Sequence, residues 1–193
     1  HLTTELGKEA QVDFGYAGKL YDTKTKKHRK AYVFVMSMSH SRHLYVEFVF
    51  KQDSRTWIQC HINAFNYFGG VPQSILLDNL KPGIISANVY DPILNKAYVE
   101  LSRHYAFVID PCKVRKPEHK GKVERSIRIV KEQLIAGRQY HNIYDANTKA
   151  IDWCQYEIGQ RVCRGTGKKP MEAFEDEKSS LLPLPKGIFD IPT

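Results

Sequence analysis

The sequence predicts an α/β fold with a mixed five-stranded sheet and helices on both of its faces. Two observations favour this fold class. Three runs rich in β-branched and aromatic residues follow one another in the N-terminal part of the chain, and strand-like and helix-like patterns alternate after them. Strands joined by short turns pair antiparallel, whereas strands joined through helices lie parallel, so the sheet is expected to contain both kinds of pairing.

The first three strands are expected over residues 10–18, 31–39 and 43–50. The run "AQVDFGYAG" alternates between apolar and polar side chains, and "AYVFVMSMS" and "HLYVEFVF" are rich in β-branched and aromatic residues. The string "KTKKHRK" at residues 24–30 separates the first two runs, and we interpret it as the basic tip of a hairpin. The three strands together predict an antiparallel meander.

A helix is expected over residues 53–70, where apolar side chains recur with helical spacing. Asp53 or Ser54 can cap its start, because either side chain can accept a hydrogen bond from a free backbone N–H of the first turn. Gly69 and Gly70 can end it, since glycine adopts the left-handed conformation that closes many helices.

Two short strands and another helix follow. Residues 74–79, "SILLDN", form an apolar run that ends in Asp-Asn, as expected of a buried central strand. A helix is predicted over residues 92–105, and residues 106–112, "AFVIDPC", are predicted to be the fifth strand.

The rest of the chain is expected to be helical, apart from a polar loop at residues 114–119. A long helix begins at about Gly121, and another covers residues 147–163. The order β-β-β-α-β-α-β-α, followed by a further α, is the order expected of the ribonuclease-H-like fold. We expect residues 1–164 to form this core, and residues 165–193 to be a C-terminal extension and linker toward a further domain.

Basic side chains outnumber acidic ones and are concentrated in one segment. Lysine and arginine number 29 against 21 aspartate and glutamate, a net charge of +8. Residues 113–138 contain nine of the basic residues and three of the acidic ones. This distribution favours a polyanionic partner, nucleic acid or an anionic membrane surface. No apolar run is long enough to span a bilayer, and we expect no membrane partner.

The four cysteines contain no C-x-x-C pair. Scattered cysteines in a chain of 193 residues fit buried thiols in a reducing cytosol better than a disulfide framework or a zinc site. They are Cys60, Cys112, Cys154 and Cys163.

Two aspartates are expected to meet at one place in the sheet. Asp13 lies on the first strand, on the face opposite Val12 and Phe14, and Asp78 ends the fourth strand. The first and fourth strands are neighbours in a sheet of this order, so the two carboxylates are expected side by side. Adjacent carboxylates repel unless a cation lies between them, and Mg²⁺ prefers such oxygen ligands.

A third carboxylate can come from the basic helix. Glu124, Arg128 and Lys131 follow one another at i, i+4 and i+7, so they share one stripe of that helix. The apolar stripe beside it is expected to face the sheet. It consists of Val123, Ile127, Val130 and Leu134.

Three strings of the sequence resemble the catalytic core of DDE transposases and retroviral-type integrases, and more narrowly the IstA-type transposases, which work with an AAA+ ATPase helper. They are "QVDFG" at residues 11–15, "LLDNLK" at residues 76–81 and "KPEHKGKVERSIRIVK" at residues 116–131. The resemblance extends from about residue 7 to Leu184, and "GTGKKPMEAF" is similar to a stretch that follows the core in many such proteins.

The resemblance implies a metal-binding catalytic triad of Asp13, Asp78 and Glu124 that holds two Mg²⁺ or Mn²⁺ ions. It implies DNA 3′-end cleavage and strand transfer by phosphoryl transfer. Arg128 and Lys131 fall at positions which in integrases contact the DNA end. The complete set of side chains that we expect to bind DNA is Asn79, Lys81, Arg115, Lys116, His119, Lys120, Lys122, Arg128 and Lys131.

The same resemblance implies partners. We expect transposon-end and target DNA, a homo-oligomer that is a dimer or larger on DNA, and an AAA+ ATPase helper. The location implied is the bacterial cytoplasm, in association with the nucleoid.

Each candidate residue also has a plainer interpretation. Glu124 can be a counter-charge for Arg128, a pairing worth ~0.3–0.5 kcal/mol on a solvated helix. Asp78 can belong to a turn, Asp13 can be a solvent-facing strand residue, and His119 can bind phosphate or cap the approach to the helix. The basic segment can be a solvated face.

Two other functions remain open. A metal-dependent nuclease of the same fold would cut DNA without joining it, and a non-catalytic DNA-binding module would bind DNA without metal. The string "GTGKK" lacks the spacing of a phosphate-binding loop and is not interpreted as one.

Overall fold

The structure is a computed structural model and describes residues 4–77, 92–111 and 126–193. Its strands are β1 (Glu9–Asp22), β2 (Lys27–Met38), β3 (Leu44–Val49), β4 (Ser74–Leu77) and β5 (Val108–Pro111). They form one sheet in the order β3-β2-β1-β4-β5. The β1–β2 and β2–β3 pairs are antiparallel and the β1–β4 and β4–β5 pairs are parallel, so the predicted mixed five-stranded sheet is confirmed.

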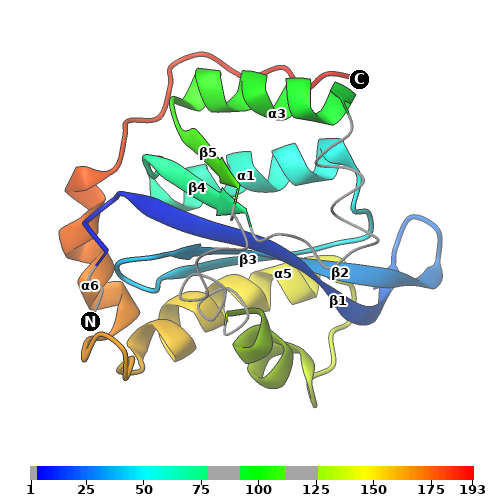
Figure 1. Cartoon of the computed structure of the whole chain (residues 1–193). Helices are drawn as coiled ribbons and strands as arrows, with labels where there is room; N and C mark the ends of the chain where they lie inside the picture. Colours follow the sequence, from blue (N-terminus) through cyan, green and yellow to red (C-terminus); the bar gives the residue numbers. More distant parts are fainter. Residues whose placement is uncertain (1–3, 78–91, 112–125) are drawn as a thin grey trace.

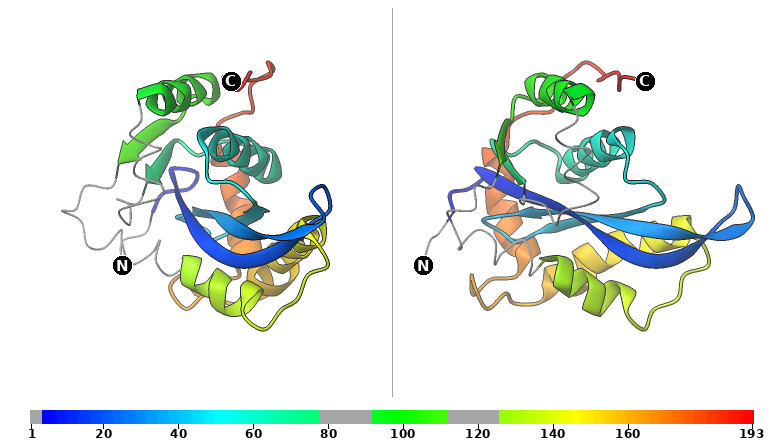
Figure 2. Two further views of the ribbon diagram at one scale, coloured as in Figure 1. Left: turned by 90° about the vertical axis from the view of Figure 1, so that its right-hand side faces the viewer. Right: turned by 45° about the vertical axis from the view of Figure 1, so that its right-hand side comes forward.

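Helices cover both faces of the sheet (Figure 1, Figure 2). One face carries α1 (Ser54–Phe68) and α3 (Pro92–Tyr105). The other carries the helical residues 126–130, which continue as the π-helical turn Lys131–Ile135, and α5 (Ile143–Asp152). A shorter helix, α6 (Pro170–Glu177), lies at one end of the sheet.

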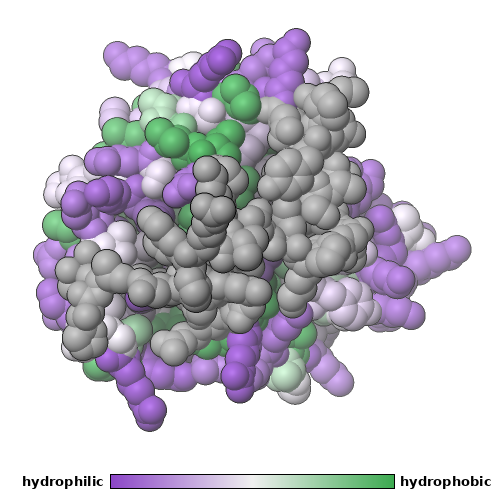
Figure 3. Space-filling model, in the orientation of Figure 1, coloured by the Kyte–Doolittle hydropathy of each residue, from purple (hydrophilic) through white to green (hydrophobic). Residues whose placement is uncertain are grey.

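The β1–β2 hairpin is longer than predicted, because side chains close its turn. The Asp22 carboxylate accepts hydrogen bonds from the Lys24 N–H at 2.9 Å and the Thr25 hydroxyl at 3.0 Å. It also pairs with Arg29 at 2.7 Å, and this hydrogen bond, with the others, lowers the pKa of Asp22 to about 2. Residues 27–30, expected in the tip, therefore belong to β2. Hydrophilic side chains extend from this protruding hairpin, on the right of Figure 3.

The predicted caps of the first helix are confirmed. The Asp53 carboxylate accepts the Thr56 N–H at 2.9 Å, and α1 begins at Ser54. Gly69 follows the helix with φ of 73°, and its N–H donates to Phe65 and Asn66 carbonyl oxygens. A left-handed φ of this kind favours glycine, which is why the helix ends there.

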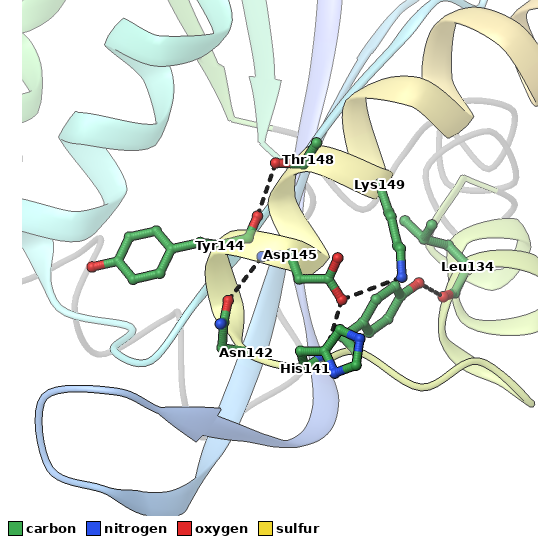
Figure 4. Close-up of polar contacts among 8 residues, drawn as sticks. Leu134, His141, Asn142, Tyr144, Asp145, Thr148 and Lys149 are labelled. Carbon is green, nitrogen blue, oxygen red and sulfur yellow. Dashed lines mark hydrogen bonds and ion pairs between the residues drawn. The ribbon is translucent and has the colours of Figure 1, made fainter.

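The helix expected over residues 147–163 begins earlier, at Ile143, and changes geometry within its length. The Asn142 side chain accepts the Asp145 N–H at 2.9 Å and so caps α5 (Figure 4). The Asp145 carboxylate accepts the His141 N–H and the Lys149 ammonium, which stabilises the first turn. After α5 the chain forms the π-helical turn Trp153–Glu157 and the 3-10 turn Ile158–Gln160.

The C-terminal segment packs along the core. The Phe174 ring of α6 lies 4.8 Å from the His43 ring, and the Glu177 carboxylate accepts the Gly7 N–H at 3.1 Å. Leu182 forms an antiparallel bridge with Val71. The stretch expected to be a linker therefore lies against the core, and near its end the Phe189 ring lies 5.5 Å from that of His104. The boundary at residue 164 and a further domain stay predictions.

The two faces of the sheet bury different side chains. The face under α1 and α3 is built largely from aromatic rings, and that under residues 126–135 and α5 from aliphatic ones. Buried members of the first include Phe14, Phe34, Trp57, Phe65 and Phe107. Buried members of the second include Val33, Val35, Val46, Ile127, Val130 and Leu134.

In the part of the chain that the structure describes, no helix is long and apolar enough to cross a membrane. Three of the cysteines are free thiols, of which Cys60 and Cys154 are buried and Cys163 is partly exposed. Cys112 lies outside the described residues.

Candidate active site

Asp13 lies near the middle of the sheet, on the face that the alternation of β1 predicts. Val12 and Phe14 are 2% and 8% exposed and point into the aromatic core under α1 and α3. Asp13 is half-buried on the opposite face, and its Cα pairs with that of Val35 on β2. Its Oδ1 accepts the Phe14 N–H at 2.8 Å, which fixes one carboxylate oxygen. The expectation that Asp13 is opposite Val12 and Phe14 is confirmed.

The Asp13 side chain borders a small hollow between the sheet and the basic helix, and the described residues leave no room in it for a water molecule. The hollow is lined by Gln11, Asp13, Val35, Ser37, Ser126 and Ile127. Gln11 and Ser37 pair across β1 and β2, and Ser126 begins the described part of the helix. Asp13 therefore faces the helical residues 126–130, and Glu124 comes two positions before Ser126 in the sequence. Sequence reasoning missed the two serines, because a lone serine carries no signal for a site.

The parallel register of β1 and β4 bears on the second aspartate. Val12 pairs with Leu77, the last residue of β4. Along the chain, Asp13 follows Val12 and Asp78 follows Leu77. Most of the other candidate residues lie outside the described residues, so their predicted placement is untested. They are Asp78, Asn79, Lys81, Arg115, Lys116, His119, Lys120, Lys122 and Glu124.

The apolar stripe of the basic helix faces the sheet, as predicted for its described part. Ile127 is 7% exposed, and Val130 and Leu134 are fully buried. Lys131 lies over Gly15, because a Cβ on that glycine would be 3.1 Å from the Lys131 Cε. Gly15 is two residues after Asp13 on the same strand face, so the Lys131 chain crosses β1 beside the candidate site.

Arg128 lies on the same helix but has a different environment. Its side chain is 77% exposed, and its Nε donates to the Glu132 carboxylate at 2.7 Å. That hydrogen bond raises the pKa of Arg128. Arg128 therefore does not need Glu124 as a counter-charge, because Glu132 already supplies a carboxylate.

Asp13 and the polar lining of the hollow fit a Mg²⁺ or Mn²⁺ site, since hard cations take carboxylate oxygen ligands and keep bound water. Within the described residues, no three His, Cys, Asp or Glu side chains gather in a way that could hold a metal ion. Of the predicted triad, the structure describes Asp13 alone.

Comparison with known proteins identifies the sequence family. Residues 8–117, more than half of the chain, match the family described as "Integrase core domain". The chain is 30% identical over 157 residues to the transposase for insertion sequence element IS21 of Pseudomonas aeruginosa, covering 81% of this chain and 40% of that protein. It is 36% identical over 189 residues to Rv3428c of Mycobacterium tuberculosis, which also bears a transposase name, covering 97% of this chain and 46% of the other. The chain thus spans less than half the length of these relatives.

Solved structures show the same fold at low sequence identity. The HTLV-2 integrase catalytic core domain in complex with magnesium matches with a TM-score of 0.60 and 18% identity, over 89% of this chain and 99% of that one. The catalytic core domain of BIV integrase matches with a TM-score of 0.62 and 14% identity, over 90% and 97%. These matches confirm the predicted ribonuclease-H-like fold, and the IS21 relative confirms the resemblance to IstA-type transposases. The chain belongs to the integrase core domain family.

Proposed function

We propose that this chain is the catalytic core of a DDE transposase, which cuts DNA at transposon 3′ ends and joins those ends to target DNA. The observation that carries the proposal is the placement of Asp13. This carboxylate lies in a polar hollow, beside the strand that ends one residue before Asp78 and below the helix that follows Glu124. Family membership supports the same chemistry.

In this proposal the three carboxylates Asp13, Asp78 and Glu124 supply oxygen ligands for two Mg²⁺ or Mn²⁺ ions. Bound there, the ions would lower the pKa of a water molecule and offset negative charge on the reacting phosphate. The Phe14 N–H holds one oxygen of Asp13 in position, which keeps the carboxylate oriented. Lys131, which lies over Gly15 on the same face, adds a positive charge near the phosphate.

The reaction then has two steps that leave no covalent bond between protein and DNA. Water attacks the phosphodiester, a new P–O bond forms, and the bond to the 3′ oxygen breaks to free a 3′-hydroxyl. That hydroxyl attacks a target phosphodiester, and the target's own 3′ oxygen leaves. Both steps are in-line displacements, which a carboxylate cluster with two ions supports.

The partners follow from the same proposal. Transposition acts on two DNA ends, so we expect a dimer or larger assembly on DNA. The similarity to IstA-type transposases also favours an AAA+ ATPase helper. Because its substrate is the bacterial chromosome, we place the protein in the cytoplasm with the nucleoid.

The proposal is tested by Mn²⁺ titration followed calorimetrically, together with joining of a pre-cut duplex oligonucleotide to plasmid DNA. We expect joining only with Mg²⁺ or Mn²⁺, and Asp13→Asn, Asp78→Asn and Glu124→Gln to slow it at least ~10³-fold, about 4 kcal/mol of activation free energy. Asp152→Asn, which changes an exposed acid at the end of α5, is the matched control and should join normally.

Three results would replace the proposal. Full joining by Asp13→Asn would remove this residue from the active site. Metal-dependent cutting without any joining would identify a nuclease. DNA binding without Mn²⁺ binding by the wild-type chain would identify a non-catalytic DNA-binding module.

A further inference from the structure

A second pocket adjoins the hollow at Asp13. Its volume is about 320 Å³, and it lies between β2, the basic helix and the segment before α6. Ser37 and Ser126 line both the pocket and the hollow, so the two lie side by side. Gln133, Arg161 and Arg164 also line the pocket.

The segment at residues 161–169, here called the basic turn, carries four basic side chains and no acidic one. Arg161, Arg164, Lys168 and Lys169 are all exposed. In the described part of the chain, no ion pair joins any of them to a carboxylate, whereas Arg128 and Arg138 each pair with a glutamate. Arg138, and after it Arg161, lower the pKa of Glu157, so part of the Arg161 charge is offset. The basic turn still presents positive charge at the edge of the pocket.

Backbone hydrogen bonds give the basic turn a definite shape. The Cys163 N–H donates to the Lys168 carbonyl at 2.9 Å, and the Gly167 N–H donates to the Cys163 carbonyl at 2.8 Å. Gly167 has φ of 70°, which allows the close reversal. Arg161 is held at the pocket by its Nη1, which donates to Gln133 Oε1 at 2.9 Å. The backbone of the turn is thus fixed by its own hydrogen bonds, and Arg161 is held against the basic helix.

We infer that the basic turn binds phosphates of the DNA strand that is held at Asp13, away from the reacting phosphate. The inference rests on the proposed function, because it takes Asp13 as part of the site where DNA is cut. Phosphates are the anions that occur in a continuous row on either side of a reacting phosphodiester, and lysine and arginine bind them without reading the sequence. An acidic protein segment would be attracted by the same charge, but the position of the pocket next to the Asp13 hollow favours DNA.

The basic turn also accounts for the string "GTGKK". A phosphate-binding loop needs a strand before it and a helix after it, and takes the phosphate on its backbone N–H groups. Here a 3-10 turn precedes the string, and its own N–H groups close the turn. Its contribution comes instead from the two exposed lysine side chains, which directly precede α6 in the chain.

The test compares two doubly substituted variants of equal charge change. Lys168→Ala with Lys169→Ala removes two cations from the basic turn, and Lys24→Ala with Lys27→Ala removes two exposed cations from the hairpin tip. Binding of a fluorescent duplex oligonucleotide is followed by anisotropy at several salt concentrations. We expect the slope of log K against log salt concentration to become less steep by about two units in the basic-turn variant. Each phosphate contact that is lost reduces this slope by ~0.9. The hairpin variant should keep the wild-type slope.

Equal slopes in the two variants, or an unchanged slope in the basic-turn variant, would overturn the inference. So would loss of binding to polyglutamate with an unchanged DNA slope, which would assign the surface to an acidic protein. Joining by the wild-type chain separates this failure from that of the proposed function. If the wild-type chain joins DNA normally and the two variants have equal slopes, only the inference about the basic turn is wrong. If the wild-type chain does not join DNA but the slopes differ as expected, the catalytic proposal is wrong and the DNA-binding surface is retained.

Discussion

One set of strands builds both faces of the sheet, yet the faces are packed in different ways. On the face under α1 and α3, the Phe34 ring lies 5.6 Å from that of Phe14, 5.8 Å from Trp57 and 5.3 Å from His61. Many of these rings meet edge to face, an arrangement that adds ~0.5–1.5 kcal/mol per pair beyond burial. This interlocked layer fixes the strands relative to the helices.

The opposite face is mainly aliphatic, although it includes Phe48 and Trp153, and it is interrupted. Gly15 has no side chain, and polar Gln11, Asp13 and Ser37 stand where the aromatic face has rings. The gap that they leave is the hollow beside the basic helix. The difference teaches that stability and chemistry are divided between the faces: one layer holds the strands, and the other places a carboxylate among small and polar side chains beside the basic helix.

The largest expected effect that tests this division is on unfolding. Phe34→Ala should lower the free energy of unfolding by ~3–5 kcal/mol, because it leaves a cavity among four neighbouring rings. Val33→Ala, one residue earlier on β2 and buried on the other face, should cost ~1.5 kcal/mol for two lost methyl groups. Urea unfolding measures both. If the two substitutions lowered the free energy of unfolding equally, the two faces would contribute equally to stability.

The second test uses pH, because the aromatic face buries two histidines. His43 and His61 are 2% and 0% exposed, and burial lowers the pKa of each to about 4. The positive charge of Lys178 lowers the pKa of His43 further. Between about pH 6.5 and 4 the unfolded chain takes up protons at these side chains and the folded chain does not, so the folded state loses stability as pH falls through that range. Each shift corresponds to at most ~3 kcal/mol.

Replacing one histidine isolates this contribution. His43→Phe keeps a ring against Tyr67, Phe68 and Phe174 and removes the titrating group, so urea midpoints should fall less steeply between pH 6.5 and 4. His28→Phe, at an exposed position on the hairpin, is the matched control and should follow the wild type. An unchanged pH dependence in His43→Phe would mean that His43 is protonated where it lies.

Local patterns in the sequence predicted much of this arrangement. Alternation along β1 was sufficient to place Asp13 opposite Val12 and Phe14, because successive side chains of a strand point to opposite faces. The strand order followed from the connections, since antiparallel neighbours need only turns and parallel neighbours need a helix between them. The caps of α1 were visible as Asp53 and Gly69 at the ends of a helical pattern.

Pairings between distant side chains were not predictable in the same way. The charged string at the hairpin looked like a loop, and only the contact of Asp22 with Arg29 across the turn makes it strand. Arg128 has carboxylates four positions away on either side in the sequence, and the structure pairs it with Glu132. The hollow and its neighbouring pocket meet at Ser37 and Ser126, residues brought together only by the packing of the helix on the sheet.

The smallest expected effect on stability, at the interrupted face, tests the comparison most directly. A Cβ at Gly15 would lie 3.1 Å from the Lys131 Cε and 3.3 Å from the Ile127 Cδ1. Gly15→Ala should therefore cost only about 1 kcal/mol, at the low end for overpacking, because the end of the lysine chain can move aside. Joining should fall several-fold, since the displaced Lys131 no longer lies beside Asp13.

The double variant separates packing from charge. Lys131→Ala in the Gly15→Ala background removes the crowded atom, so stability should return toward the wild-type value while joining stays low. If Gly15→Ala alone cost as much as Phe34→Ala, the face that carries Asp13 would be as tightly packed as the aromatic one. The division between a stabilising face and a binding face would then fail.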